Sequence, residues 1–344
     1  MVVRIDHIDG LRGVAIGSVA LFHAFARWPD LVPYGSRYAD YFGYGWLGVE
    51  LFFLISGFVI LMTLERSRSF GDFMIRRWLR LFPAMLICSA IIFLTAPAFP
   101  YRPTGAPRLA DIVPGITFID NRWLELIGGP NRTLEGSFWS LFVEMKFYIG
   151  FGLAYFLAGR TFAIAGLVLI FILYPLTQAL GLGAAHYALY LLDAPYMAWF
   201  ASGALFYLST KAGDWRLMAA AIAVGVLAAF GELPGQGVVP LPALIVVGLF
   251  TIVLTVPTVQ RTLTTPPIMF LGAISYPLYL LHEGAMISTV RWLGNAPLPG
   301  FLLPFIPLAG LCVLAWLIAE HIEGPARGLL KRRLLGTRRW LPVT

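Results

Sequence analysis

Arg12 and His23 are the residues near the start of the chain whose types and spacing could do chemistry. They lie in the apolar stretch GLRGVAIGSVALFHAF, residues 10–25. At about 100° per residue, the eleven steps between them return to within roughly 20° of one direction, so a helix puts both on one face, roughly 16 Å apart along its axis. Asp9, three residues before Arg12, joins that face. The stretch therefore presents a carboxylate, a guanidinium and an imidazole, which can take a proton near pH 7.

Each of these three residues also has a structural interpretation. Arg12 could extend to lipid headgroups, Asp9 could cap the helix, and His23 could hydrogen-bond between helices. Ionisable residues inside an apolar membrane segment are costly, however, and tend to mark functional paths. Three of them on one face favour a functional site.

Lipid is the solvent that the composition favours, because 59% of the 344 residues are hydrophobic and only 12% are charged. We expect an all-α, polytopic membrane helix bundle of about ten transmembrane helices. It forms a single domain over residues 1–344, with a basic cytoplasmic tail at about 321–344. The first apolar segment is expected to be a retained span and not a signal peptide, because Asp6 and Asp9 lie at its start. The segments long enough to span a bilayer are 9–26, 46–64, 81–99, 138–157, 161–180, 187–209, 216–231, 241–257, 270–291 and 300–320.

The net charge is +7, and the basic residues are distributed as expected for a membrane protein. Lysines and arginines cluster in short segments beside the apolar runs, and most lie on the side that would hold both ends of the chain. We therefore expect both termini in the cytoplasm, the long connection at about 100–137 outside, and no nucleic-acid partner. Cys88 and Cys312 lie apart in apolar runs, so no metal site is expected.

Polar residues recur at helical spacing in the fourth apolar segment. Ser140, Glu144 and Tyr148 form one i, i+4 row. Glu144 could orient His23, bind Arg12 or form a purely structural ion pair. Lys146 lies about 200° around the helix from Glu144 and is expected to pair with another acid.

Two more groups of residues share helix faces. Arg76 and Arg80 are spaced i, i+4, and Arg77 and Arg80 are spaced i, i+3. In the ninth apolar segment, the residues at i, i+4 and i+7 are Ser275, Tyr279 and His282. The second group could line a substrate site or supply hydrogen bonds between helices.

Five segments, in order along nearly the whole chain, carry a resemblance to a known family. They are IDGLRGVAIGSVALFH, GVELFFLISGFVI, FMIRRWLRLFPA, SFWSLFVEMKFY and ISYPLYLLH. They resemble motifs of the membrane acyltransferase 3 family, the integral-membrane O-acyltransferases. That family has an Arg or Lys, ten residues and then a His in its first helix, which Arg12 and His23 match. The chain departs from the family at Met145 and Lys146, where Glu-Gln is frequent, and at Glu50, where Asp is frequent; both departures bear on acceptor specificity.

The resemblance implies transfer of an acyl group, often acetyl, from cytoplasmic acyl-CoA to a hydroxyl of a cell-surface or lipid-linked carbohydrate. Acyl-CoA is then a co-substrate, and no tightly bound cofactor is expected. The implied location is a bacterial inner membrane, in contact with its lipids. Exopolysaccharide, lipopolysaccharide O-antigen, peptidoglycan, a lipid-linked sugar and a small macrolide are alternatives as acceptor, and no oligomeric state is predicted.

For this function His23 is assigned as the general base toward the acceptor hydroxyl, with Arg12, Glu144 and Asp9 completing the catalytic set. His282 is the rival base, and an acyl-histidine intermediate is an alternative to direct transfer. Arg12 could instead hold the acyl carbonyl or pair with Glu144.

The substrate-binding residues follow from the same resemblance. Arginine forks suit phosphate oxygens, so the residues expected to hold acyl-CoA are Arg76, Arg77 and Arg80; the alternative is simple anchoring at the cytoplasmic surface. The residues expected to bind the acceptor are Ser275, Tyr279 and His282.

Two other functions stay open. A transporter or flippase of a glycan or lipid precursor would also have many spans with intramembrane charges, although no internal repeat is visible. A non-catalytic component of a polysaccharide assembly complex is the other. Acyl transfer by the protein would distinguish the acyltransferase from the transporter and from the non-catalytic component.

Overall fold

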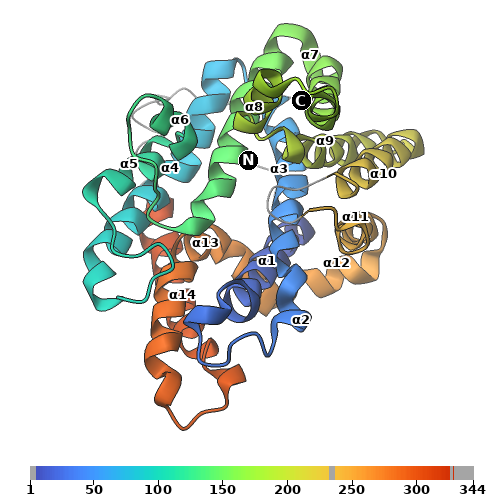
Figure 1. Ribbon diagram of the computed structural model, residues 1–344. Coiled ribbons are helices and arrows are strands. Elements are labelled where there is room, and N and C mark those ends of the chain that lie inside the picture. Colours follow the sequence, from blue (N-terminus) through green and yellow to red (C-terminus); the bar gives the residue numbers. More distant parts are fainter. Residues whose placement is uncertain (1–4, 232–236, 326–327, 329–344) are drawn as a thin grey trace.

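The computed structural model describes residues 5–231, 237–325 and 328, and α-helices dominate this part of the chain (Figure 1). No β-strand is formed within these ranges. The α-helices are α1 Asp6–Phe22, α2 Ala39–Phe42, α3 Gly48–Leu64, α4 Phe70–Thr95, α5 Val113–Thr117, α6 Asn121–Leu126, α7 Trp139–Ala179, α8 Gly183–Leu191, α9 Met197–Ala212, α10 Trp215–Ala229, α11 Pro240–Thr255, α12 Pro257–Leu263, α13 Pro266–Trp292 and α14 Phe305–Ile318. Most of the predicted basic tail, 321–344, lies outside the described residues.

Five helical segments within the described ranges are long and apolar enough to cross a membrane. They are Asp6–Arg27, Ala39–Leu64, Phe70–Ala98, Gly136–Ala179 and Gly300–Glu323. A sixth exists if α11 and α12, which meet at 103°, form one span. The all-helical, multi-pass class is therefore confirmed. By length and composition, the described residues contain five or six membrane-spanning segments and not the ten that were predicted.

The predicted spans at 138–157 and 161–180 correspond to the two helices that α7 joins across a kink at Gly159. Gly159 interrupts α7 with a positive φ of 83°, a conformation that glycine adopts without steric cost. The predicted span at 187–209 is wrong, because the chain breaks between α8 and α9. Asp193 there is left-handed (φ 56°), and Pro195 follows in a short 3₁₀ turn.

Glycines of the first motif allow α1 to pack closely against α13, and Figure 1 shows these two helices crossing near the centre of the molecule. A Cβ on Gly13 would collide with the backbone oxygen of Ile268, and one on Gly272 with the backbone oxygen of Asp9. Small residues let helix backbones approach in this way. The helices run in the same direction, and roughly 15 Å beyond this contact each carries a histidine, His23 and His282, which meet.

Substitution of Gly13 by alanine is expected to destabilise the protein by about 1–3 kcal/mol, because a methyl group has no room against Ile268. The same change at Gly17, where a Cβ meets nothing within 4 Å, should be neutral or slightly stabilising. Thermal melting of the two variants in detergent checks this. Equal melting temperatures would contradict the close-packing account.

The long connection at 100–137 is a packed cap and not an irregular loop. It contains α5 and α6, and four of its charged side chains are buried: Arg102, Asp111, Asp120 and Glu135. Each is paired; for example, Arg102 Nη2 lies 3.0 Å from Glu135 Oε1. Buried charges of this kind are retained only with partners, so the cap has a defined structure.

Candidate active site

His23 lies at the point where α1 ends and a π-helical turn, His23–Arg27, begins. Such turns are frequent at functional sites. The His23 ring lies against His282 of α13, with His282 Nε2 3.2 Å from His23 Nδ1. On its other side, His23 Nε2 is 3.6 Å from Glu283 Oε1. The structure thus brings together two histidines and a carboxylate from opposite ends of the sequence.

The hydrogen bonds define which nitrogen of each ring holds a proton. His23 Nδ1 is 2.9 Å from the carbonyl oxygen of Val19, and His282 Nδ1 is 2.9 Å from that of Tyr279. A carbonyl oxygen only accepts, so Nδ1 carries the proton in both neutral rings. His23 Nε2 is then the nitrogen with a lone pair, and it faces a carboxylate that can stabilise the imidazolium.

Glu283 is held by two N–H donors from other parts of the chain. The indole Nε1 of Trp28 donates to Oε1 at 3.2 Å, and the backbone N–H of Ser137 donates to Oε2 at 2.7 Å. The carboxylate is only 2% exposed. Its position is therefore fixed by the end of the π-helical turn and by the start of α7.

A second buried carboxylate supports the same region. Glu135 pairs with Arg102 and accepts the backbone N–H of Gly284 at 3.0 Å. Because Gly284 follows Glu283 directly, this contact joins the cap to α13 beside the histidine pair.

A cavity lies next to the histidine pair and collects most of the predicted site residues. Those that line it are Arg12, Arg77, Arg80, Ser140, Glu144, Tyr148, Ser275 and Tyr279. Tyr279 connects the cavity to the histidine pair: it lines the cavity, and its ring centroid is 5.6 Å from that of His282. Neither His23 nor His282 is among the residues that line the cavity.

Glu144 makes neither contact that the sequence analysis considered. Instead of His23 or Arg12, it accepts hydrogen bonds from Ser56 at 2.6 Å and Tyr148 at 2.5 Å. Arg77 Nη2 donates to the Tyr148 hydroxyl at 2.9 Å. The carboxylate that faces His23 is Glu283, because α13, not α7, packs against α1 at this depth.

The remaining predicted residues lie near the other end of α1 and on α4. Arg12 Nη1 is 3.7 Å from Asp9 Oδ1, so these two form an ion pair on the predicted face. Arg76 does not line the cavity; its guanidinium pairs with Asp72 at 2.9 Å.

Lys146 pairs with two acids, as the sequence predicted for its face of α7. Its Nζ lies 2.5 Å from Asp120 and 2.6 Å from Asp193, and Arg122 contacts the same two carboxylates. This ion cluster, made of Asp120, Arg122, Lys146 and Asp193, joins the cap to α7 and to the break before α9. Burial alone would raise the pKa of Asp120, but hydrogen bonds from Arg122 and Lys146 hold it below its ordinary value of 3.8.

Substitution of Asp120 by asparagine should lower stability at neutral pH and flatten the acid limb of the stability profile. The folded-state pKa lies below 3.8, so the stabilisation is complete above that value and is lost as the pH falls through the lowered pKa. The gap in melting temperature between wild type and variant should therefore be constant from pH 7 to about pH 4 and narrow as the pH falls further towards 3. Asp40→Asn, at an exposed carboxylate, is the control; a gap that stays constant down to about pH 3 would contradict this account.

Sequence reasoning missed Glu283, Trp28, Ser137, Glu135 and Arg102. A signal for Glu283 was present, since it is an ionisable residue in the apolar segment 270–291 and adjoins His282. The others lie outside the predicted spans: the π-helical turn after α1 brings Trp28 to α13, and the folded cap brings Arg102, Glu135 and Ser137 there.

Comparisons with known proteins give one family match over most of the chain. A family described as an acyltransferase domain matches residues 5–321. Peptidoglycan O-acetyltransferase OatA of Listeria monocytogenes is 26% identical over 160 residues, which are 42% of this chain and 23% of that protein. YrhL of Bacillus subtilis, named as a candidate peptidoglycan O-acetyltransferase, is 27% identical over 161 residues, with the same coverage. The matched region thus spans about a quarter of these relatives. No solved structure matches.

Proposed function

Since the chain belongs to the acyltransferase 3 family, we propose that it is a membrane O-acetyltransferase that uses cytoplasmic acetyl-CoA and acylates a hydroxyl of a cell-surface or lipid-linked carbohydrate. The observation that carries this proposal is the lone pair of His23 Nε2, which faces Glu283 beside a cavity lined by three arginines. The names of OatA and YrhL support acetyl as the group and a glycan as the acceptor class.

In the proposed reaction His23 takes the proton of the acceptor hydroxyl, and Glu283 stabilises the imidazolium that forms. The acceptor oxygen bonds to the acetyl carbon while the carbon–sulfur bond of the thioester breaks. The proton passes to the leaving thiolate, so coenzyme A departs as the thiol. The Nδ1–H of His23, which donates to the Val19 carbonyl, is shared with His282 Nε2 at 3.2 Å, and His282 supports the base as this second acceptor.

We assign the cavity to the acyl donor. Arg12, Arg77 and Arg80 line it together, and guanidinium groups suit the phosphates of coenzyme A. The end of α1 that carries Arg12 then faces the cytoplasm, and His23 lies roughly 16 Å deeper. Ser275 and Tyr279 line this same cavity, so in this assignment they contact the donor and not the acceptor.

The experiment is transfer of label in membranes. Membranes with and without the expressed chain are given radiolabelled acetyl-CoA, and label is followed into glycan and lipid fractions. Label that appears in glycan only with the chain is the expected result, and it also identifies the acceptor fraction. Absence of label from every fraction would reject the enzyme and leave the transporter and the non-catalytic component as explanations.

A further inference from the structure

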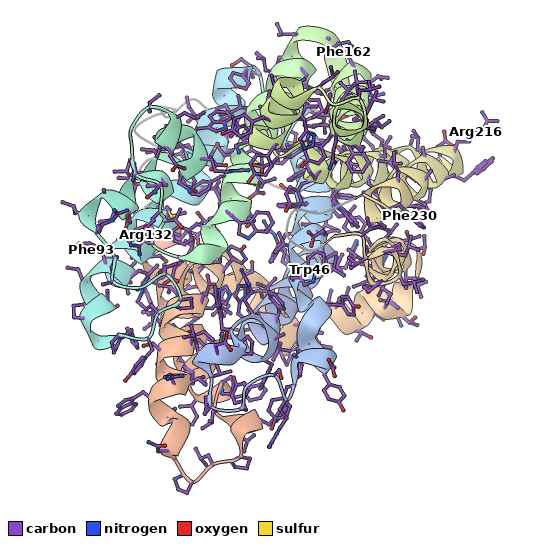
Figure 2. The ribbon with its side chains drawn as sticks, in the orientation of Figure 1. Trp46, Phe93, Arg132, Phe162, Arg216 and Phe230 are labelled. Atoms are coloured by element: carbon purple, nitrogen blue, oxygen red, sulfur yellow. The ribbon has the colours of Figure 1, made fainter. Side chains whose placement is uncertain are left out.

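A second pocket, on the cap side of the histidine pair, is lined by polar residues. It has a volume of about 310 Å³, which is within the range of small-molecule sites, roughly 300–1,000 Å³. Thr104, Asn121, Asn131 and Arg132 line it, with Trp139 at the start of α7. None of these residues contributes to the cavity assigned to the donor. Figure 2 labels Arg132 among the cap segments that hold α5 and α6.

The lining has the chemistry of a carbohydrate site. Trp139 is 39% exposed and packs on Tyr196, with 5.2 Å between ring centroids, so its position is supported from within. An indole face stacks on the C–H face of a sugar ring. Amide and guanidinium groups suit sugar hydroxyls, because they offer several donors and acceptors in fixed geometry.

The polar residues are also held in place. Arg132 Nη2 donates to the backbone oxygen of Thr104, which uses one of the five guanidinium N–H groups. Asn121 Nδ2 donates to the backbone oxygen of Asn131 at 3.0 Å, which leaves the Asn121 carbonyl oxygen as an acceptor for a ligand. A preorganised lining lowers the ordering cost of binding.

The floor of this pocket is the segment that fixes Glu283. Gly136 lines the pocket, and a Cβ on it would lie 3.1 Å from the Glu283 carboxylate. The next residue, Ser137, donates its N–H to that carboxylate. One short segment thus separates the pocket from the partner of His23.

We propose that this pocket binds a sugar unit of the acceptor glycan next to the unit that is acylated. The inference rests on the proposed function and assigns its acceptor side. It also accounts for two buried pairs of the cap, Arg102–Glu135 and Glu135–Gly284, which hold the pocket floor against α13.

The kinetic test uses membranes with labelled acetyl-CoA and the glycan fraction extracted from the envelope of the expressing cells. Arg132→Ala and Trp139→Phe should raise the KM for glycan about tenfold and leave the KM for acetyl-CoA unchanged. Arg37→Ala removes an exposed arginine outside the pocket and should change neither. Transfer by all variants with the wild-type glycan KM would overturn the proposal.

The binding test needs no transfer and so separates this inference from the proposed function. Asn131→Cys, in a chain whose Cys88 and Cys312 are replaced by alanine, is labelled with a maleimide that does not cross membranes. The glycan fraction should slow labelling of Asn131→Cys severalfold and leave the labelling of Arg37→Cys, in the same cysteine-free background, unaffected. Equal labelling rates with and without glycan would overturn the inference even where transfer occurs.

Discussion

Replacement of His23 by alanine should reduce acetyl transfer by about 10²- to 10⁴-fold, the usual contribution of a positioned acid–base group. The reason is geometric: Nε2 is the only His23 nitrogen with a lone pair, since Nδ1 donates to Val19. Alanine removes this acceptor and its contact with Glu283. The measurement is the initial rate of label transfer from acetyl-CoA in membranes, normalised to the amount of folded protein.

Two other histidine variants sharpen this test. His186→Ala is the matched control, because that ring bonds to the Tyr174 carbonyl on α7 and is far from α1 in sequence and contacts; it should retain wild-type transfer. His282→Ala should lower the rate less than His23→Ala, because it removes a supporting acceptor only. Full transfer by His23→Ala together with loss in His282→Ala would move the base to His282.

The sequence of the first motif was enough to predict which of its residues share a helix face, because helical periodicity depends only on residues close together in the chain. Arg12 and Asp9 share a face simply because a helix returns every 3.6 residues, and the structure joins them in an ion pair. Ser140, Glu144 and Tyr148 likewise line one cavity. The glycines of the motif could be seen in the sequence, but their purpose, close approach to α13, depends on a helix about 260 residues away.

The parts that sequence could not supply are those that depend on which helices are neighbours. Glu144 was considered as the partner of His23, and nothing in the spacing distinguishes it from Glu283. The helix break at Asp193 could not be predicted, because it lies within an apolar run. Asp193 is held there by ion pairs with Arg122 and Lys146, which come from distant segments of the chain. The cap could be recognised as long and polar, but its buried pairs follow only from its packing.

Replacement of Glu283 by glutamine should lower kcat about tenfold to a hundredfold, the loss expected when a buried hydrogen-bonded charge no longer stabilises a developing cation. The KM for acetyl-CoA should stay near its wild-type value, because Glu283 does not line the donor cavity. Glu283→Asp keeps the charge and should recover part of the lost rate. These readouts separate a positioning residue from one that only maintains the fold.

Glu135→Gln is the matched control, because it makes the same change at a neighbouring carboxylate. Glu135 is equally buried and also accepts two N–H groups, from Arg102 and Gly284. Glutamine has one carbonyl oxygen in place of two carboxylate oxygens, so both variants lose an acceptor. Glu135→Gln also leaves the buried Arg102 guanidinium without its carboxylate and should lose at least as much stability as Glu283→Gln. Only the change at Glu283 removes the charge that faces His23 Nε2. If the two variants lost kcat equally after normalisation to folded protein, Glu283 would have a structural role alone, and the stabilisation of the His23 imidazolium would have to come from elsewhere.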